Sequence, residues 1–359
     1  MFRRSLLGAV VALFAIAAPA GAADDPGAVY ALSNAASGNA VLVYDRASDG
    51  SLSYGGSYAT GGLGLGAGLG SQGAVTVSGD GRVLLAVNAR SNSVSTFAVE
   101  SDGLELRDVE GSGGIRPTSV AERNGLVYVL NAGVPNSIAG FRLDAKGELT
   151  PIAGSVRPLA ADQTTPSQVA IAPSGDALVV TERATNAIMT WALGKDGVPG
   201  ASHVFASGGA GPFGFAFGHR NTFVVSDAAG TSGASSYRLD GAQVETISPL
   251  VPSMRTAACW TVVTKDGRFA YVTNGGTGDV TGLAIDQDGS LSLLDPSGVS
   301  ASVGGSAVDA ALSNGSRYLY VRNGALPKVD AFRIAGDGSL SWVGSVDGLP
   351  ATAAGLAAR

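Results

Sequence analysis

Short apolar runs alternate along this chain with polar, glycine-rich turns, and seven of these runs end in an amide or carboxylate side chain. The seven endings are Leu32-Ser33-Asn34, Ala86-Val87-Asn88, Val129-Leu130-Asn131, Val180-Thr181-Glu182, Val225-Ser226-Asp227, Val272-Thr273-Asn274 and Val321-Arg322-Asn323. Their final residues recur at intervals of 43 to 54 positions. A repeat of this length with several short strands per unit is typical of a β-propeller.

Each unit contains three recognisable strands and a more variable fourth one. In one unit a small-residue strand at 167–172 is followed by the turn Pro173-Ser174-Gly175-Asp176 and a second strand at 177–181. Third strands begin with an aromatic residue and lead into an Asp-Gly turn, as at 332–340, which is a strong hairpin signal. We therefore predict an all-β fold, a seven-bladed propeller of four-stranded antiparallel blades.

The two ends of the repeat region complement each other. The first unit begins at 28–30, already in its second strand, and lacks an inner strand. The tail at 353–358 has the small-residue pattern of an inner strand. We predict that the C-terminal strand completes the N-terminal blade and so closes the ring, which removes an open sheet edge.

The first 22 residues have the pattern of a secretory signal peptide. Arg3 and Arg4 precede an apolar run at 6–18, and Ala20-Gly21-Ala22 is a small-residue cleavage site. We predict a signal peptide at 1–22, a propeller at 23–359, and export to the periplasm or the outside of the cell. The arginine pair also fits a twin-arginine signal, but the general secretory route is favoured.

The composition of the chain argues against some classes of binding partner. The formal net charge is −6 and the chain has no basic run, which argues against nucleic acid and anionic membrane surfaces. Cys259 is the only cysteine, so no intrachain disulfide can form. A closed propeller gives no reason to expect more than a monomer. The glycine-rich run at 61–70 precedes no helical pattern, so we expect a flexible loop between two blades rather than a phosphate-binding loop.

Candidate chemistry gathers where second strands end and inner strands begin, because both positions open on one face of the ring. The residues predicted to act in catalysis are Glu182, Arg183, Arg116 and Arg255. The residues predicted to bind substrate are Asp227, Arg322, Asn131, Asn274, Trp260 and Gln168. Asp309 is a further member of this ring.

Glu182 and Asp227 stand out because the equivalent residue is Asn in the other five units. A carboxylate beside arginines can act as a general acid or base while an arginine polarises a carbonyl or binds a carboxylate. The alternative is structural, since Asn, Asp and Glu can all cap the following turn. Each arginine has a similar alternative, which is pairing with a neighbouring acid.

The sequence contains few of the residues that metal sites and nucleophilic catalysis need. His203 and His219 are the only histidines, and neither falls on the mouth side in register. No cluster has metal-ligand spacing and no G-x-S-x-G motif occurs, so we expect no metal and no cofactor. Cys259 is expected to be a buried, inert thiol.

With these residues in view, the chain resembles the seven-bladed β-propeller lactonases, which include propeller-type 6-phosphogluconolactonases, carboxymuconate lactonising enzymes and exported YVTN-repeat relatives. The resemblance rests on Tyr271-Val272-Thr273-Asn274, the Gly-Asp and Asp-Gly turns, the aromatic-led third strands and the seven-unit count. It implies a propeller fold and lactone hydrolysis. In the family's pattern the acid position is Glu182, whereas the histidine positions are Thr165 and Ser167 and an arginine-histidine pair falls on Cys259-Trp260.

Two hypotheses follow. The first is an exported lactonase-like hydrolase acting on a small lactone or related ester, with Glu182 activating water and Arg116, Arg183 or Arg255 stabilising the oxyanion. The second is a non-catalytic exported propeller that binds a ligand or partner at the same mouth. Clustering of Glu182 with two arginines in one pocket would favour the enzyme. A mouth lined by Asn and Gly, with Glu182 held in a turn, would favour the binding protein.

Overall fold

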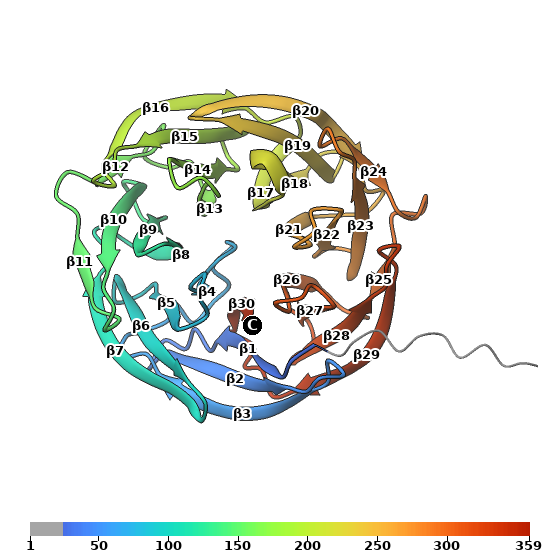
Figure 1. Ribbon diagram of the computed structural model, residues 1–359, viewed down its shortest axis with the longest axis horizontal. Helices are drawn as coiled ribbons and strands as arrows, with labels where there is room; N and C mark the ends of the chain where they lie inside the picture. The colour runs from blue at the N-terminus through green and yellow to red at the C-terminus, as the bar shows by residue number, and fades with distance from the viewer. Residues whose placement is uncertain (1–23) are drawn as a thin grey trace, which may run out of the picture.

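Seven β-sheets stand in a ring around a central axis in the computed structural model, which describes residues 24–359 (Figure 1). This confirms the predicted all-β, seven-bladed propeller. The predicted signal peptide at 1–22 lies outside the described residues. Apart from one 3-10 turn at His219–Asn221, the described elements are strands. None of the helical segments described between 24 and 359 has the length and apolar character needed to cross a membrane.

We name the blades A to G in chain order. Blade A contains β1 (Gly27–Leu32), β2 (Ala40–Arg46), β3 (Leu52–Ala59) and β30 (Ala354–Ala358); blade B contains β4 (Val75–Val77), β5 (Val83–Asn88), β6 (Ser93–Glu100) and β7 (Gly103–Gly111); blade C contains β8 (Pro117–Arg123), β9 (Leu126–Asn131), β10 (Ser137–Leu143), β11 (Leu149–Pro151) and β12 (Arg157–Pro158); blade D contains β13 (Pro166–Ile171), β14 (Ala177–Glu182), β15 (Ala187–Leu193) and β16 (Pro199–Ala206). Blade E contains β17 (Ala210–Phe217), β18 (Thr222–Ala229), β19 (Gly233–Asp240) and β20 (Gln243–Pro252); blade F contains β21 (Ala258–Val263), β22 (Phe269–Asn274), β23 (Asp279–Ile285), β24 (Leu291–Leu293) and β25 (Ala301–Ser302); blade G contains β26 (Ala307–Leu312), β27 (Tyr318–Asn323), β28 (Lys328–Ile334) and β29 (Leu340–Asp347).

The hydrophobic core lies between neighbouring blades. Second strands such as β14 are buried along their whole length, which explains their continuous β-branched and apolar sequence. The aromatic residues of the third strands, for example Phe97, Trp191 and Tyr237, are fully buried in these inter-blade clusters. They therefore pack between blades.

Short turns connect the strands within each blade. The Asp-Gly turns place their glycines at positive φ, 80° at Gly197 and 84° at Gly338, a conformation in which a side chain would be strained. The sequence pattern and the turn geometry therefore agree.

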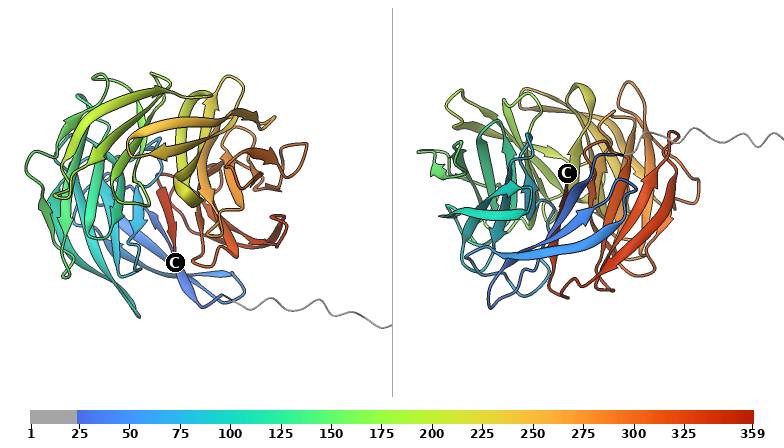
Figure 2. Two further views of the ribbon diagram at one scale, coloured as in Figure 1. Left: turned by 45° about the horizontal axis from the view of Figure 1, so that its top comes forward. Right: turned by 60° about the horizontal axis from the view of Figure 1, so that its bottom comes forward.

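The ring is closed as predicted. The C-terminal strand β30 pairs antiparallel with β1, with Tyr30 opposite Ala357 and Ala31 opposite Leu356. It becomes the innermost strand of blade A, and Figure 2 shows it beside the first strands of the chain. Leu356 is buried there in a cluster with residues of blade G. One blade is thus built from both ends of the described chain.

Candidate functional site

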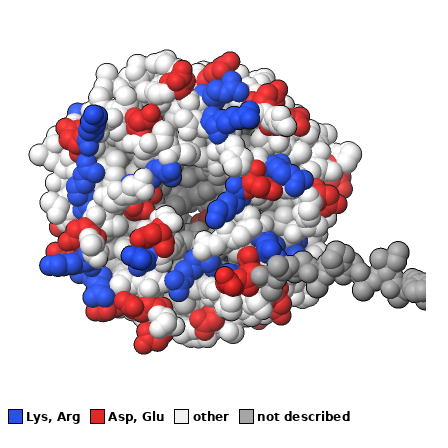
Figure 3. All heavy atoms as spheres, viewed as in Figure 1, with Lys and Arg blue, Asp and Glu red and all other residues white. Residues whose placement is uncertain are grey.

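The ends of the second strands and the starts of the inner strands meet on one face of the ring, which we call the mouth. Pro117 pairs with Asn131, Pro166 with Glu182 and Ala258 with Asn274, each at the first rung of its blade. Figure 3 shows a view down the ring, with a hollow at its centre and basic side chains among those around it. The register therefore gathers the predicted residues at one opening.

A β-bulge follows the first rung of the inner strand in several blades. The pairing skips one residue between Pro117 and Ser119, between Pro166 and Gln168 and between Ala258 and Trp260. Beside these bulges, non-glycine residues occupy the left-handed region, with φ of 56° at Arg116, 52° at Thr165, 58° at Ala257 and 58° at Asp309. Such backbone strain persists only where the surrounding structure holds it, and it concentrates at functional sites.

The residues that end the second strands attach the segment arriving from the previous blade. Asn88 accepts a hydrogen bond from the Thr60 hydroxyl at 2.7 Å, and the Asn131 side chain donates to the Ser112 carbonyl at 3.0 Å. In blade G, Asn323 donates to the Val303 carbonyl at 3.0 Å. These side chains are buried, so they hold the blades together rather than face the channel.

Glu182 has the same position in blade D and is fully buried. One carboxylate oxygen accepts a hydrogen bond from the Ala160 backbone amide at 3.3 Å, and the other accepts one from the Thr185 hydroxyl at 2.8 Å. Among residues 24–359 no arginine lies within ion-pair distance of it, the neighbouring Arg183 included. A Glu182 side chain held in a turn is the arrangement expected of the binding protein rather than of the enzyme.

Asp227 belongs to a cluster of hydrogen-bonded polar side chains in blade E. Its carboxylate accepts from Ser207 at 3.2 Å and from Ser235 at 2.7 Å. The Tyr237 hydroxyl donates to Ser235 at 2.8 Å, accepts from the Gly208 backbone amide at 2.6 Å and lies 3.2 Å from the Ser207 hydroxyl. Burial raises the pKa of Asp227 to about 7, although both serine hydroxyls favour its ionised form.

Arg183 differs from these residues because its guanidinium has no acceptor among residues 24–359. It lies 4.9 Å from the centre of the Phe213 ring, in a cation–π contact, and its Nε is buried without a hydrogen-bond partner in the described chain. Burial lowers the pKa of Arg183 below its usual range, opposed by the nearby Cys259. Burial also raises the pKa of the Cys259 thiol to about 11, which fits the inert thiol expected from the sequence.

The other three predicted arginines have different surroundings. Arg116 is exposed and donates to the Ala132 carbonyl at the mouth. Arg255 forms an ion pair with the buried Asp279, and this bond raises the pKa of the arginine. Arg322 is half-buried beside Asp309. Only Arg255 thus shows the pairing with an acid that the sequence left as the alternative.

Of the remaining predicted residues, Gln168 and Trp260 lie on inner strands, whereas Asn274 ends a second strand and is buried within its blade. The Gln168 side-chain amide bridges two inner strands, donating to the Phe215 carbonyl at 2.9 Å and accepting from the Phe215 amide at 2.6 Å. Asn274 donates to Asp279 at 2.8 Å and to Thr281 at 2.9 Å. Trp260 is buried against Phe213, with ring centres 4.9 Å apart. All three side chains are therefore engaged in contacts within the protein.

The glycine-rich segment is the main feature that sequence reasoning missed. It does connect blades A and B, but residues 70–73 cross to the inner strands of other blades. Trp260 donates to the Ser71 carbonyl at 2.9 Å, and the Gln72 amide group bonds both backbone groups of Thr261 at 2.7 and 2.9 Å. The residues that directly follow the run at 61–70 are therefore attached across the channel, which the predicted loop between two blades did not include. A run of glycines does not indicate which strands it will contact.

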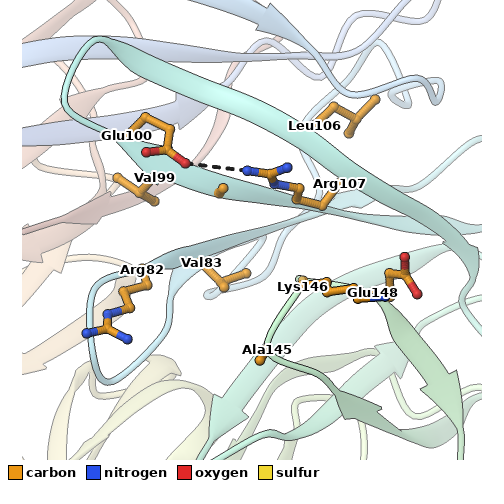
Figure 4. Close-up of a pocket in the computed structure, with 11 residues that line it drawn as sticks. Arg82, Val83, Val99, Glu100, Leu106, Arg107, Ala145, Lys146 and Glu148 are labelled. Atoms are coloured by element: carbon orange, nitrogen blue, oxygen red, sulfur yellow. Dashed lines mark hydrogen bonds and ion pairs between the residues drawn. The ribbon is translucent and has the colours of Figure 1, made fainter.

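On the opposite face, grooves of about 350 to 710 Å³ separate neighbouring blades. Figure 4 shows the groove of about 710 Å³ between blades B and C, where Arg107 pairs with Glu100 at 3.4 Å. His219 lines another groove on this face and His203 lies on the outer strand β16, so both histidines are away from the mouth as predicted. Within residues 24–359 no group of three or more His, Cys, Asp or Glu side chains has metal-site geometry.

Part of this chain matches a model of a known protein family. A family model described as "Lactonase, 7-bladed beta-propeller" matches residues 109–251. Among curated proteins, none matches this chain in sequence. The resemblance to the propeller lactonases is thus shown by the family model over blades C to E and the end of blade B.

Solved structures agree in fold over nearly the whole chain. The periplasmic gluconolactonase of Pseudomonas aeruginosa has a TM-score of 0.74 at 18% identity, covering 92% of this chain and 98% of its own. A Bacteroides fragilis protein provisionally assigned as a 6-phosphogluconolactonase has a TM-score of 0.69 at 18% identity, covering 93% and 98%. A similarly assigned Bacteroides uniformis protein has a TM-score of 0.73 at 17% identity, covering 92% and 99%. At these identities the likeness establishes the fold alone.

Proposed function

We propose, from this family resemblance, that the chain is a lactonase-like hydrolase whose ligand site is the mouth of the central channel. The observation that carries the proposal is Arg183, a half-buried guanidinium that has no protein acceptor in the described chain. Removing a cation from water without a partner is costly, so a carbonyl or anionic oxygen from a ligand would offset that cost. Arg183 is then the group that binds the lactone carbonyl and the oxyanion formed from it.

In this reaction, water adds to the lactone carbonyl and the ring C–O bond breaks to give a hydroxy acid. Glu182 is the carboxylate nearest in sequence to Arg183, and it accepts from the hydroxyl of the exposed Thr185. Displacement of that hydroxyl by a ligand would free one carboxylate oxygen to act as a general base. Arg116, exposed on the same face, is a second group that can contact the substrate.

A second candidate is a non-catalytic binding propeller. The observation that favours it is the burial of Glu182, whose two oxygens are both hydrogen-bonded within the blade. On this hypothesis Arg183 binds an acceptor group of a small ligand at the mouth, and no bond is broken.

One experiment separates the two functions. Purified mature protein is assayed for proton release against sugar, muconate-type and aliphatic lactones, together with Arg183→Gln, Glu182→Gln and the control Arg220→Gln on the opposite face. Turnover lost in the Arg183 and Glu182 variants but kept in the control supports the hydrolase with both roles. Turnover that survives in Glu182→Gln retains the hydrolase and removes Glu182 as its base. Absence of turnover on every lactone, with binding that depends on Arg183, supports the binding protein.

We also propose that the protein is exported and acts as a monomer on a small molecule. The support is the pattern at 1–22 and the closed ring. N-terminal sequencing of the protein from fractionated cells tests cleavage after Ala22, and light scattering tests the monomer.

A further inference from the structure

The boundary between blades G and A is unlike the other inter-blade boundaries, because β30 reaches its blade from the opposite end of the repeat region. The other six inner strands are joined to their second strands by short turns, whereas β30 pairs with β1 without any turn between them. On its other side β30 contacts β26 and β27 of blade G. We call this boundary the seam. Opening of β30 is not restrained by a hairpin, so side-chain contacts across the seam matter more there.

A buried carboxyl group lies at the seam. Asp309 is the bulge residue of β26 and is 1% exposed. Strand β26 packs against β30, and the backbone amide of Gly355 in β30 lies close enough to Asp309 to favour its ionised form. One of its oxygens accepts from the adjacent Ala310 amide at 3.0 Å, whereas Oδ2 is buried without a partner in the described chain. A carboxylate in this position is poorly solvated.

Arg322 is the charged group that faces Asp309. It lies on β27, on the side where Tyr320 packs against the seam, and its Nε is also buried without a partner among the described residues. The two side chains do not come within ion-pair distance. Neither β30 nor the strand β4 beyond it carries a titratable side chain, and β21 on the other side of β26 carries Cys259. Arg322 therefore compensates an Asp309 charge only in part.

These positions make ionisation of Asp309 unfavourable in the closed ring. Burial raises the pKa of Asp309 to about 7, against the lowering effects of Arg322 and of the Ala310 and Gly355 backbone amides. Because Gly355 belongs to β30, the environment of the carboxyl group depends on that strand being in place. When β30 opens, water reaches the carboxyl group and its pKa returns toward the ordinary value.

We propose that the seam is a proton-controlled latch, in which β30 is held while Asp309 carries its proton and opens more readily when Asp309 ionises. The sign follows from linkage. The closed ring binds the proton more tightly than the open one, so opening is promoted as the pH rises from about 4 to about 7 and levels off above that. One proton changes the opening equilibrium by at most about tenfold per pH unit in this window.

Hydrogen exchange of the β30 amides tests the latch. Protection factors of residues 354–358, corrected for intrinsic exchange, are measured at pH 5, 6, 7 and 8 for the full mature protein and for Asp309→Asn. We expect protection in the wild type to fall with a slope approaching tenfold per pH unit up to pH 7. In Asp309→Asn, which cannot ionise, we expect the slope to vanish.

Two further variants keep the test decisive. Asp309→Gly removes the carboxyl group and suits the φ of 58°, since the bulge residue of blade A is Gly355 at a φ of 72°. Asp227→Asn removes a carboxyl group with a similarly raised pKa from blade E, and β30 should keep its full slope in that variant. The latch is overturned if the β30 slope persists in both Asp309 variants, or if Asp227→Asn abolishes it equally.

Discussion

Asp227 and Asp309 are two buried carboxyl groups whose burial raises the pKa to the same value of about 7, yet their partners differ. Asp227 accepts two serine hydrogen bonds within a polar cluster. Asp309 accepts one bond from its own neighbour and leaves Oδ2 without a partner in the described chain. Desolvation thus gives the two carboxyl groups a similar proton affinity. The contacts of each group determine which neighbouring structure is disturbed when that group ionises.

The comparison separates two uses of the same residue type. In blade E, the carboxyl group replaces an amide that attaches the incoming segment, and its neighbours can reorient hydroxyl groups around either protonation state. At the seam, ionisation leaves a charge that Arg322 and the Ala310 and Gly355 backbone amides offset only in part. Asp227 is therefore a structural residue, and its ionisation changes only the hydrogen bonds around it. Ionisation of Asp309, in contrast, affects the closure of the ring.

The largest expected effect is the loss of the seam itself. Deleting residues 350–359 removes β30, exposes the edge of β1 and uncovers Asp309, so we expect the ring to lose its cooperative melting transition. Circular dichroism and calorimetry measure the loss. Adding a synthetic peptide of residues 349–359 should restore part of the transition, which attributes the loss to the strand. A truncated protein that melts like the wild type would show that closure contributes nothing.

The second effect concerns the close packing of Asp227. A Cβ added to Gly209 would collide with the Asp227 carboxyl carbon, whereas one added to Gly336 meets no atom within 4 Å. We expect Gly209→Ala to lower the free energy of unfolding by about 1–3 kcal/mol. The control Gly336→Ala should stay within about 0.5 kcal/mol of the wild type. Urea denaturation at pH 6 compares them, and equal stabilities would contradict the packing argument.

The sequence predicted the ring, its closure and the mouth positions, because strand period, turn chemistry and repeat length are local patterns. It did not predict which way the side chains face. A bulge adds one residue and alters the alternation beyond it, and in blade G the bulge falls at Asp309, one step later than in blades C, D and F. The buried state of Glu182 and Asp227 also depends on the segment arriving from the previous blade. Contacts of that kind join residues about 20 positions apart and leave no periodic signal.

The third effect changes sign with pH. Arg322→Met removes a half-buried guanidinium that favours the ionised form of Asp309, so the pKa of Asp309 should rise further. At pH 5, where Asp309 is protonated, we expect the variant to match or slightly exceed the wild type, since an unpartnered Nε is also removed. At pH 8 we expect it to be less stable by about 1–2 kcal/mol. Chemical denaturation at the two pH values measures this, with the exposed Arg220→Met as control, and a pH-independent difference would remove the coupling.

The smallest effect concerns Arg183, where stability and function should oppose each other. Its guanidinium has no protein acceptor in the described chain, and burial lowers its pKa, so the folded state gains little from the charge. Arg183→Met keeps the contact with Phe213 and removes the unpartnered donor. We therefore expect the free energy of unfolding to stay equal or rise by up to about 1 kcal/mol, while ligand binding at the mouth is lost. Calorimetry and the lactone assay measure the two changes. A clear loss of stability would instead mean that Arg183 holds the blades together, like the amides at the strand ends, and that the mouth has lost its best candidate for binding a ligand.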